Sequence, residues 1–370
     1  MTGGLVVILG EVGDNFAAGM TGGMAFIYDE NNEFEKKVNS DSVIWQTPET
    51  KYWINNLKNL VNEHFEETNS SLSKKITQKT LTPNFNADSA YLYIKNQVDF
   101  GPRVPNSLAH DNCHQYLSEN LKRFGADVIT QEAPIKRYDG LLLNMKNIIA
   151  SFNKDIAKRI LLCAHWDSRF IADNDTQDID KPILGANDGG SGVGVLLEIA
   201  RQLSLHPIPI GVDIIFFDIE DQGQPNGENY QIAHSWCLGS QYWSNNPHVE
   251  DYFADFGILL DMVAGENAKF TKEGVSRQFA SRIVDETWGV AGSIGFANYF
   301  VNEKTPPIID DHLYINNLIH IPTINIVEYD ANTHNRFNAH HHKHSDNMEI
   351  IDYNTLKAVG QTVLEVLYRY

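Results

Sequence analysis

Six short apolar runs between residues 127 and 329 constrain the fold most strongly. The runs cover residues 127–135, 141–152, 159–167, 212–220, 256–263 and 322–329. Each has the length and composition of a buried strand. Helical patterns lie at 109–125, 191–203 and 353–368. Because strands that alternate with helices form a sheet covered on both faces, we predict an α/β fold with a mixed, mostly parallel central sheet flanked by helices.

Residues 1–76 have a different character. Glycines at positions 3, 4, 10, 13, 19, 22 and 23 surround short β-branched runs, a pattern typical of stacked short strands with tight corners. Trp53, Leu57, Leu60 and Phe65 then follow near helical spacing. We expect a small glycine-rich β-solenoid fragment and a helix, with little stability in isolation because a solenoid end needs a neighbouring coil.

A polar connector rich in Ser, Thr and Lys separates this segment from the rest of the chain. We assign residues 1–76 to the N-terminal fragment, 77–86 to a linker and 87–370 to a catalytic domain. A length of 370 residues suits one large domain accompanied by a small one.

Composition limits the possible partners. The formal net charge of −19 would repel a phosphate backbone, so no nucleic acid is expected to bind. No apolar run approaches the roughly 18 residues of a membrane span. The odd number of cysteines (Cys113, Cys163 and Cys237) argues against a disulfide framework and is compatible with reduced, buried thiols. No basic segment precedes the first apolar run, so we expect no secretory signal and, for the chain as written, a cytoplasmic location.

Polar side chains gather where the predicted strands end or where a helix begins. The set consists of His165, Asp167, Asp188, Glu220, Asp221 and Asp261. Function collects at the carboxyl ends of strands in such sheets, and charged groups there are costly unless paired or ligated. Taken singly, each Asp could cap a turn and the His could simply be hydrogen-bonded. Together with one C-terminal histidine they predict a zinc site for one or two ions, with Glu220 as a base outside the ligand set.

The order of "HWDS", "GANDGGSGVGVLLEIAR", "FFDIED", "LLDMV", "DDH" and "KHSDN" resembles the zinc aminopeptidase clan and, within it, the bacterial glutaminyl cyclases (glutaminyl-peptide cyclotransferases). "FGPRVPNSLAH" and "SWCLGSQYW" resemble the cyclase branch as well. This resemblance spans residues 84–370. Residues 1–76 closely resemble the C-terminal end of the glutamate synthase large subunit. A gene fusion and a wrongly joined reading frame are the two alternative explanations for this segment.

The cyclase resemblance implies a zinc site at named positions. Asp188, Asp221 and His344 would hold the ion, and Glu220 would be the general acid and base. His340, His341 and His342 have no counterpart role and are interpreted as loop residues.

The resemblance also implies supporting groups. Asp261 and Asp310 would complete a hydrogen-bond network beside the base, while His165 and Asp167 would orient the site from behind the ligands. Trp236 would wall a pocket for a glutamine side chain or else pack in the core.

Two chemistries fit these residues. In a cyclase, one zinc ion polarises the γ-carbonyl of an N-terminal glutamine, which its own α-amine attacks with release of ammonia. The alternative is a di-zinc aminopeptidase, for which all ligand types are present. Asp310 favours the cyclase, because peptidase relatives usually carry a small hydroxyl residue there and a carboxylate can share a proton with Asp261. The expected substrate is a peptide or protein with N-terminal glutamine. Relatives are commonly monomeric, and bacterial ones are typically exported, which leaves the compartment open.

Overall fold

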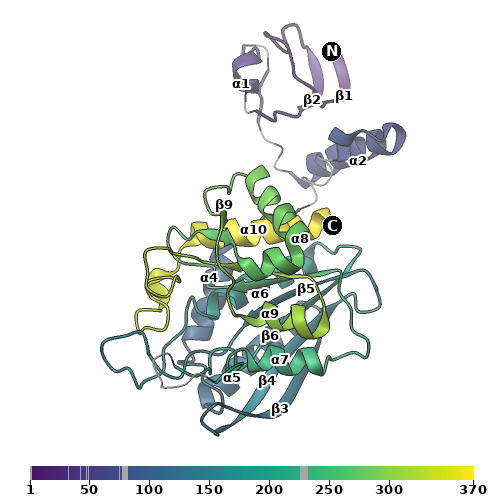
Figure 1. Cartoon of the computed structure of the whole chain (residues 1–370). Helices are drawn as coiled ribbons and strands as arrows, with labels where there is room; N and C mark the ends of the chain where they lie inside the picture. The colour runs from purple at the N-terminus through teal and green to yellow at the C-terminus, as the bar shows by residue number, and fades with distance from the viewer. Residues whose placement is uncertain are drawn as a thin grey trace. The chain divides into compact units, whose positions relative to one another are not determined.

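The protein is described here by a computed structural model, drawn in Figure 1. The structure describes residues 2–370 except 32, 42, 47, 49, 75, 77–81 and 226–231. The chain divides into two compact units, residues 1–82 and residues 83–368. Residues 77–81 of the predicted linker lie outside the described residues.

The N-terminal unit contains one pair of parallel strands. β1 (Thr2–Ile8) pairs with β2 (Gly22–Ile27). The helices α1 (Phe34–Lys37) and α2 (Lys51–Thr68) follow. Phe26 of β2 packs edge to face against Trp53 of α2, with ring centroids 6.2 Å apart. Parallel strands in one short segment are the geometry expected for a coil of the predicted solenoid.

A six-stranded sheet forms the centre of the larger unit, in the order β10-β7-β5-β6-β4-β3. Its strands are β3 (Asp127–Lys136), β4 (Leu142–Phe152), β5 (Arg159–His165), β6 (Gly211–Phe217), β7 (Phe256–Asp261) and β10 (Thr323–Val327). The four strands from β10 to β6 are parallel, and β4 runs antiparallel to both β6 and β3. The mixed, mostly parallel sheet predicted from the sequence is confirmed.

Helices cover both faces of this sheet (Figure 1). They are α4 (Ala87–Val98), α5 (Leu108–Arg123), α6 (Gly190–Leu205), α7 (Leu238–Asn245), α8 (Gly274–Ser293), α9 (Asp311–Tyr314) and α10 (Tyr353–Arg369). A π-helical turn (Ile315–Ile319), a 3₁₀ turn (Met348–Ile350) and a small parallel pair, β8 (Phe270–Lys272) and β9 (Phe300–Lys304), complete the unit.

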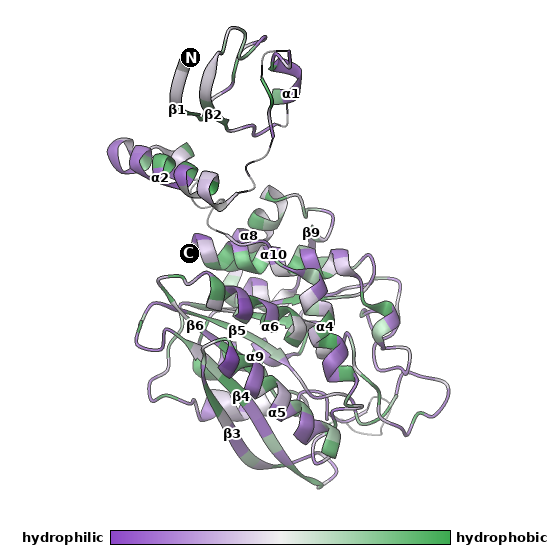
Figure 2. Ribbon diagram, turned by 180° about the vertical axis from the view of Figure 1, so that it is seen from behind, coloured by the Kyte–Doolittle hydropathy of each residue, from purple (hydrophilic) through white to green (hydrophobic). Residues whose placement is uncertain are grey.

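The alternation of side chains along β5 explains the two covered faces. Ile160 and Leu162 join a core shared with α4, α5, α6, α8 and α10. Leu161 and Cys163 point the other way, into a second core that contains Trp243 of α7. Because both faces are covered, every residue of β5, β6, β7 and β10 is buried. On the outer strand β3, by contrast, Figure 2 shows hydrophilic and hydrophobic segments alternating.

Two glycines bring α6 close to the sheet. A Cβ atom on Gly192 would lie 2.3 Å from the carbonyl oxygen of Leu260, next to the end of β7. Gly189 has a left-handed backbone (φ +40°), and a Cβ there would lie 2.6 Å from the ring of His165. The glycine-rich start of α6 therefore allows the preceding turn, which carries Asp188, to lie against the ends of β5 and β7.

The last residues of the predicted linker pack with the larger unit. Phe85 is buried in its main core, and the backbone N–H of Phe85 donates to Gln361 Oε1 at 2.8 Å. Cys113, Cys163 and Cys237 are free and buried. In the part of the chain that the structure describes, no helix combines the length and apolar character that a membrane crossing requires.

Candidate metal centre and active site

The predicted polar residues lie at the carboxyl edge of the parallel strands. His165 is the last residue of β5 and Asp261 the last of β7, while Glu220 and Asp221 follow β6. Asp188 lies in the turn before α6. The loop between β10 and α10 adds histidines to this group, so segments far apart in sequence meet at one edge of the sheet.

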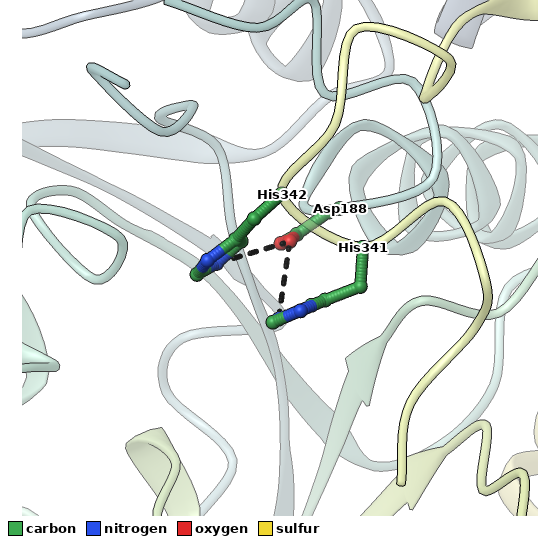
Figure 3. A group of neighbouring side chains, drawn as sticks. All are labelled: Asp188, His341 and His342. Carbon is green, nitrogen blue, oxygen red and sulfur yellow. Dashed lines mark ion pairs between the residues drawn. The ribbon is translucent and has the colours of Figure 1, made fainter. Parts of the chain in front are cut away.

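Asp188, Asp221 and His342 form the centre of the site. His342 Nε2 lies 3.0 Å from Asp221 Oδ1 and 3.7 Å from Asp188 Oδ2. Figure 3 shows His341 and His342 extending from one loop toward Asp188, and His341 Nε2 lies 3.8 Å from Asp188 Oδ2. The side chains of Asp188, His341 and His342 are largely withdrawn from solvent.

His344, the histidine predicted to hold the metal, lies away from these carboxylates. Its ring Nε2 is 3.1 Å from the carbonyl oxygen of Asp178, and its backbone N–H donates to Asp175 Oδ2 at 2.9 Å. The ring of His344 therefore lies against the exposed 175–178 loop, whereas His341 and His342, interpreted from sequence as residues without a role, reach the carboxylates. The backbone of His342 is left-handed (φ 55°), and this turn directs its ring inward.

The donor set fits a zinc ion. Ligand atoms about 2.0 Å from a tetrahedral zinc ion are separated by about 3.3 Å, and the 3.0 and 3.7 Å separations around His342 Nε2 bracket that value. Asp188 Oδ2 and Asp221 Oδ2 are buried and accept no hydrogen bond from the residues that the structure describes. Buried carboxylate oxygens without partners are costly, and a bound cation would satisfy both.

The electrostatics of the centre are those of a site that exchanges protons for a cation. Burial alone would lower the pKa of His342, but Asp221 and Asp173 raise it to about 10. Burial raises the pKa of Asp221 to about 6, although His342 opposes the rise. Because metal ligands bind in their deprotonated forms, a cation that binds to His342 and Asp221 would release protons.

A second group of potential ligands adjoins the first. His165 Nε2 lies 3.1 Å from Asp188 Oδ1 and 3.2 Å from Asp261 Oδ1. Although burial lowers it, hydrogen bonds to Asp167, Asp188 and Asp261 raise the pKa of His165 well above its usual value. Burial, opposed by His165 and reinforced by the charge of Asp310, raises the pKa of Asp261 to about 7.

Asp167 holds the loop that carries Glu220 and Asp221. Its Oδ1 accepts from the backbone N–H of Glu220 and its Oδ2 from that of Asp221, both at 3.1 Å. The side-chain amide of Gln222 donates to the same Oδ2 at 3.0 Å. These bonds fix the backbone from which both acidic side chains project.

Glu220 lies among other acids beside the cation centre. A Glu220 carboxylate oxygen, Cys237 Sγ and an Asp310 carboxylate oxygen all lie within 4.8 Å of one another. Cys237 Sγ donates to Glu220 Oε1 at 3.1 Å, and Asp310 Oδ2 accepts from Asn325 Nδ2 at 2.6 Å. Burial and the charges of Asp221 and Asp310 raise the pKa of Glu220 well above its usual value. Glu220 therefore has the environment of a group that accepts and returns a proton.

Trp236 is half-buried next to the centre. Its ring is stacked on that of His342, with centroids 5.8 Å apart and an interplanar angle of 14°. A Cβ on Gly223 would lie 2.0 Å from the same indole, so Trp236 covers a residue that must lack a side chain. The indole is therefore partly exposed and lies beside His342 rather than in the centre of the core.

Sequence reasoning missed several groups that organise the site. Asp346, in the quoted "KHSDN", accepts from the backbone N–H groups of Asn187 (2.7 Å) and Asp188 (3.1 Å) and so ties the histidine loop to the Asp188 turn. Arg169, two residues after Asp167, is fully buried. Both residues lie outside the predicted strands and helices, so no pattern in the sequence marks them as buried.

The two parts of the chain are similar to different known proteins. Residues 147–367 match peptidase family M28, and residues 1–87 match the GXGXG motif family. A glutaminyl cyclase from Bacteroides thetaiotaomicron, solved with bound N-acetylhistamine, is 54% identical with a TM-score of 0.76; the match covers 78% of this chain and 99% of that one. The glutaminyl cyclase of Tannerella forsythia is 50% identical (TM-score 0.76, 77% and 99% covered). A Zn-dependent exopeptidase from Parabacteroides distasonis is 52% identical (TM-score 0.77, 78% and 99% covered).

The chain therefore belongs to peptidase family M28. Within that family, the unit from residue 83 onward is a member of the glutaminyl cyclases. The similar exopeptidase is Zn-dependent, and the ligand types present in this chain suit the same metal, so both observations support zinc.

The N-terminal unit has a separate relationship. It is 47% identical over 79 residues to the chloroplastic ferredoxin-dependent glutamate synthase 2 of Arabidopsis thaliana. The match covers 21% of this chain and 5% of that protein, so the chain spans only a small part of the glutamate synthases that it matches.

Proposed function

We propose that this protein is a zinc-dependent glutaminyl-peptide cyclotransferase, which converts the N-terminal glutamine of peptides or proteins to pyroglutamate and releases ammonia. The observation that carries the proposal is the position of Glu220. It adjoins the predicted cation ligands, its own carboxylate faces Cys237 and Asp310, and its pKa is raised. A cyclase needs such a proton carrier beside one cation.

Asp188, Asp221 and His342 would hold one zinc ion. When bound, zinc would polarise the γ-carbonyl oxygen of the substrate glutamine. The remaining work belongs to the chain's own residues. Asp167 and Asp346 hold the backbone of the two carboxylate ligands in place through the hydrogen bonds described above.

Glu220 would move the proton that the reaction must relocate. A bond forms between the α-amino nitrogen and the γ-carbonyl carbon, and the bond from that carbon to the amide nitrogen breaks. Glu220 takes a proton from the attacking amine and returns it to the departing nitrogen, which leaves as ammonia. Asp310 and Asp261, whose pKa values are also raised by burial, would keep a proton available beside it.

Proximity would also contribute to the rate. Both reacting groups belong to one residue, so a site that holds that residue in its reactive conformation would lower the entropic part of the barrier. The flat face of Trp236 beside His342 is suited to pack against the methylene groups of a glutamine side chain.

A di-zinc aminopeptidase is the second candidate, and the group His165, Asp188 and Asp261 favours it. Their ligand atoms lie within 4.8 Å of one another, as a second cation would need. Against it, Asp310 helps to keep the pKa of Asp261 near 7, so a proton competes with a second ion for this carboxylate. We therefore propose one zinc ion.

Product analysis distinguishes the two activities. The zinc-loaded protein is incubated with a peptide that begins with glutamine, and ammonia, free glutamine and peptide mass are followed together. Cyclisation releases ammonia and leaves a peptide lighter by one ammonia with a blocked N-terminus. Release of free glutamine would instead establish the aminopeptidase and overturn the proposal.

A further inference from the structure

The neighbouring residues His341 and His342 have opposite hydrogen-bonding partners on their Nδ1 atoms. His341 Nδ1 lies 3.1 Å from Asn174 Nδ2 and 2.8 Å from Asn335 Nδ2. Amide nitrogens only donate, so this Nδ1 accepts and the ring proton of neutral His341 is on Nε2. The atom of His341 that faces Asp188 therefore carries a hydrogen and has no lone pair for a metal.

His342 presents the reverse arrangement. Its Nδ1 lies 3.0 Å from Asp173 Oδ1, and a carboxylate only accepts, so this Nδ1 carries the hydrogen. In the neutral ring the lone pair is then on Nε2, which is the atom 3.0 Å from Asp221 Oδ1. A carboxylate behind a histidine fixes its tautomer and raises its basicity toward a metal.

A buried arginine holds Asp173. Arg169 Nε and Nη2 donate to the two carboxylate oxygens of Asp173 at 3.2 and 2.8 Å. Its Nη1 donates to the backbone carbonyl oxygens of Asp221 (2.9 Å) and Gly223 (2.8 Å). Its guanidinium also lies 4.4 Å from the ring centroid of Trp236. One side chain thus connects the carboxylate behind His342, the backbone that carries Asp221, and the indole beside both.

We propose that Arg169 and Asp173 form a positioning pair that makes His342, and not the adjacent His341, the imidazole ligand of the cation. The inference rests on the proposed zinc site and adds the residues that select its histidine. Neither Arg169 nor Asp173 belongs to the proposed ligand set of the cation. The pair acts through the tautomer of His342 and through the backbone of Asp221.

A purely structural ion pair would have a different signature. It would stabilise the fold but would leave the intrinsic zinc affinity of folded protein unchanged. A positioning pair must alter that affinity when it is removed. Replacement of His341, on which the pair does not act, must leave the affinity unchanged.

Zinc affinity of the full chain tests the proposal. Apoprotein is titrated with zinc against a chromophoric chelator, and folding of each variant is checked by circular dichroism. Asp173→Asn is expected to weaken zinc binding by about 10–100-fold, whereas His341→Gln keeps the wild-type affinity. Unchanged affinity in Asp173→Asn, or an equal loss in His341→Gln, would overturn the inference. If wild-type protein failed to bind zinc, the proposed function itself would fail instead.

Two further measurements keep the test decisive if Asp173→Asn does not fold. The double variant Asp173→Asn/Arg169→Gln leaves no buried charge unpaired and is expected to show the same weakened binding. Long-range ¹H–¹⁵N correlation spectra of the zinc-loaded wild-type protein report the tautomers without any substitution in the pair. We expect the proton on Nδ1 of His342 and on Nε2 of His341; a proton on Nε2 of His342 in the zinc form would refute the inference.

Discussion

Replacing Glu220 with glutamine separates proton transfer from the shape of the site. The backbone N–H of Glu220 donates to Asp167 Oδ1, and its carbonyl oxygen accepts from the N–H of Cys237 at 3.0 Å. The side-chain Oε1 accepts from Cys237 Sγ. Glutamine has the same shape and keeps an oxygen that can accept this bond, so the loop that carries Asp221 should stay in place.

The expected loss follows from the proton-carrying role. Positioned general acids and bases contribute about 10²–10⁴-fold to a rate, or about 2.7–5.5 kcal/mol of activation free energy. Burial and neighbouring acids raise the pKa of Glu220, so a neutral amide there adds little electrostatic strain. We expect kcat for Glu220→Gln to fall by about 10²–10⁴-fold, while zinc content stays at the wild-type level.

The assay is the initial rate of ammonia release from a glutamine-initiated peptide, with zinc measured by mass spectrometry on the same samples. Glu266→Gln, which changes an exposed acid outside the site, is the matched control and should retain the wild-type rate. A normal rate in Glu220→Gln would refute the assigned role. Loss of zinc together with activity would show that Glu220 is a ligand.

Three further predictions follow from the structure. His342→Gln should abolish stoichiometric zinc binding, whereas His344→Gln should leave it intact. The opposite pattern in metal analysis would show that His344 is the zinc ligand, as predicted from the sequence. Gly192→Ala should lower the free energy of unfolding by about 1–3 kcal/mol in urea titrations, because the new Cβ would lie 2.3 Å from a backbone oxygen. Gly289→Ala in α8 is the control and should not destabilise the protein, because a Cβ there meets nothing within 4 Å. Removing residues 1–76 should leave kcat/KM unchanged, because the residues of the site all lie in the larger unit; an inactive truncation would show that the N-terminal unit takes part.

The sheet could be predicted because its signal is local. An apolar run such as Arg159–His165 must be buried on both sides whichever strands adjoin it. The helix α8 was not predicted; it consists of two helical segments joined at Ala280, where the backbone is non-helical (φ −138°, ψ 39°). The short helix α7 offers only eight residues in which to recognise a period.

The sequence could predict that the carboxylates of the site lie together, but it could not predict which histidine of the C-terminal loop lies beside them. Asp221 follows β6, Asp261 ends β7 and Asp188 precedes α6, so their meeting at one edge of the sheet follows from topology. His342 and His344 lie in an irregular loop, where the direction of a ring depends on backbone turns that spacing does not reveal. The partner that distinguishes His342 is Asp173, which is remote in sequence and recognisable only once the loop has folded.

Anomalous X-ray diffraction at the zinc absorption edge, from crystals of the zinc-loaded protein, tests the central claim most directly. We predict one strong peak, coordinated by Asp188, Asp221 and His342, with the carboxylate of Glu220 outside the ligand sphere. A peak at His344, or a second peak of equal height between His165 and Asp261, would contradict this account.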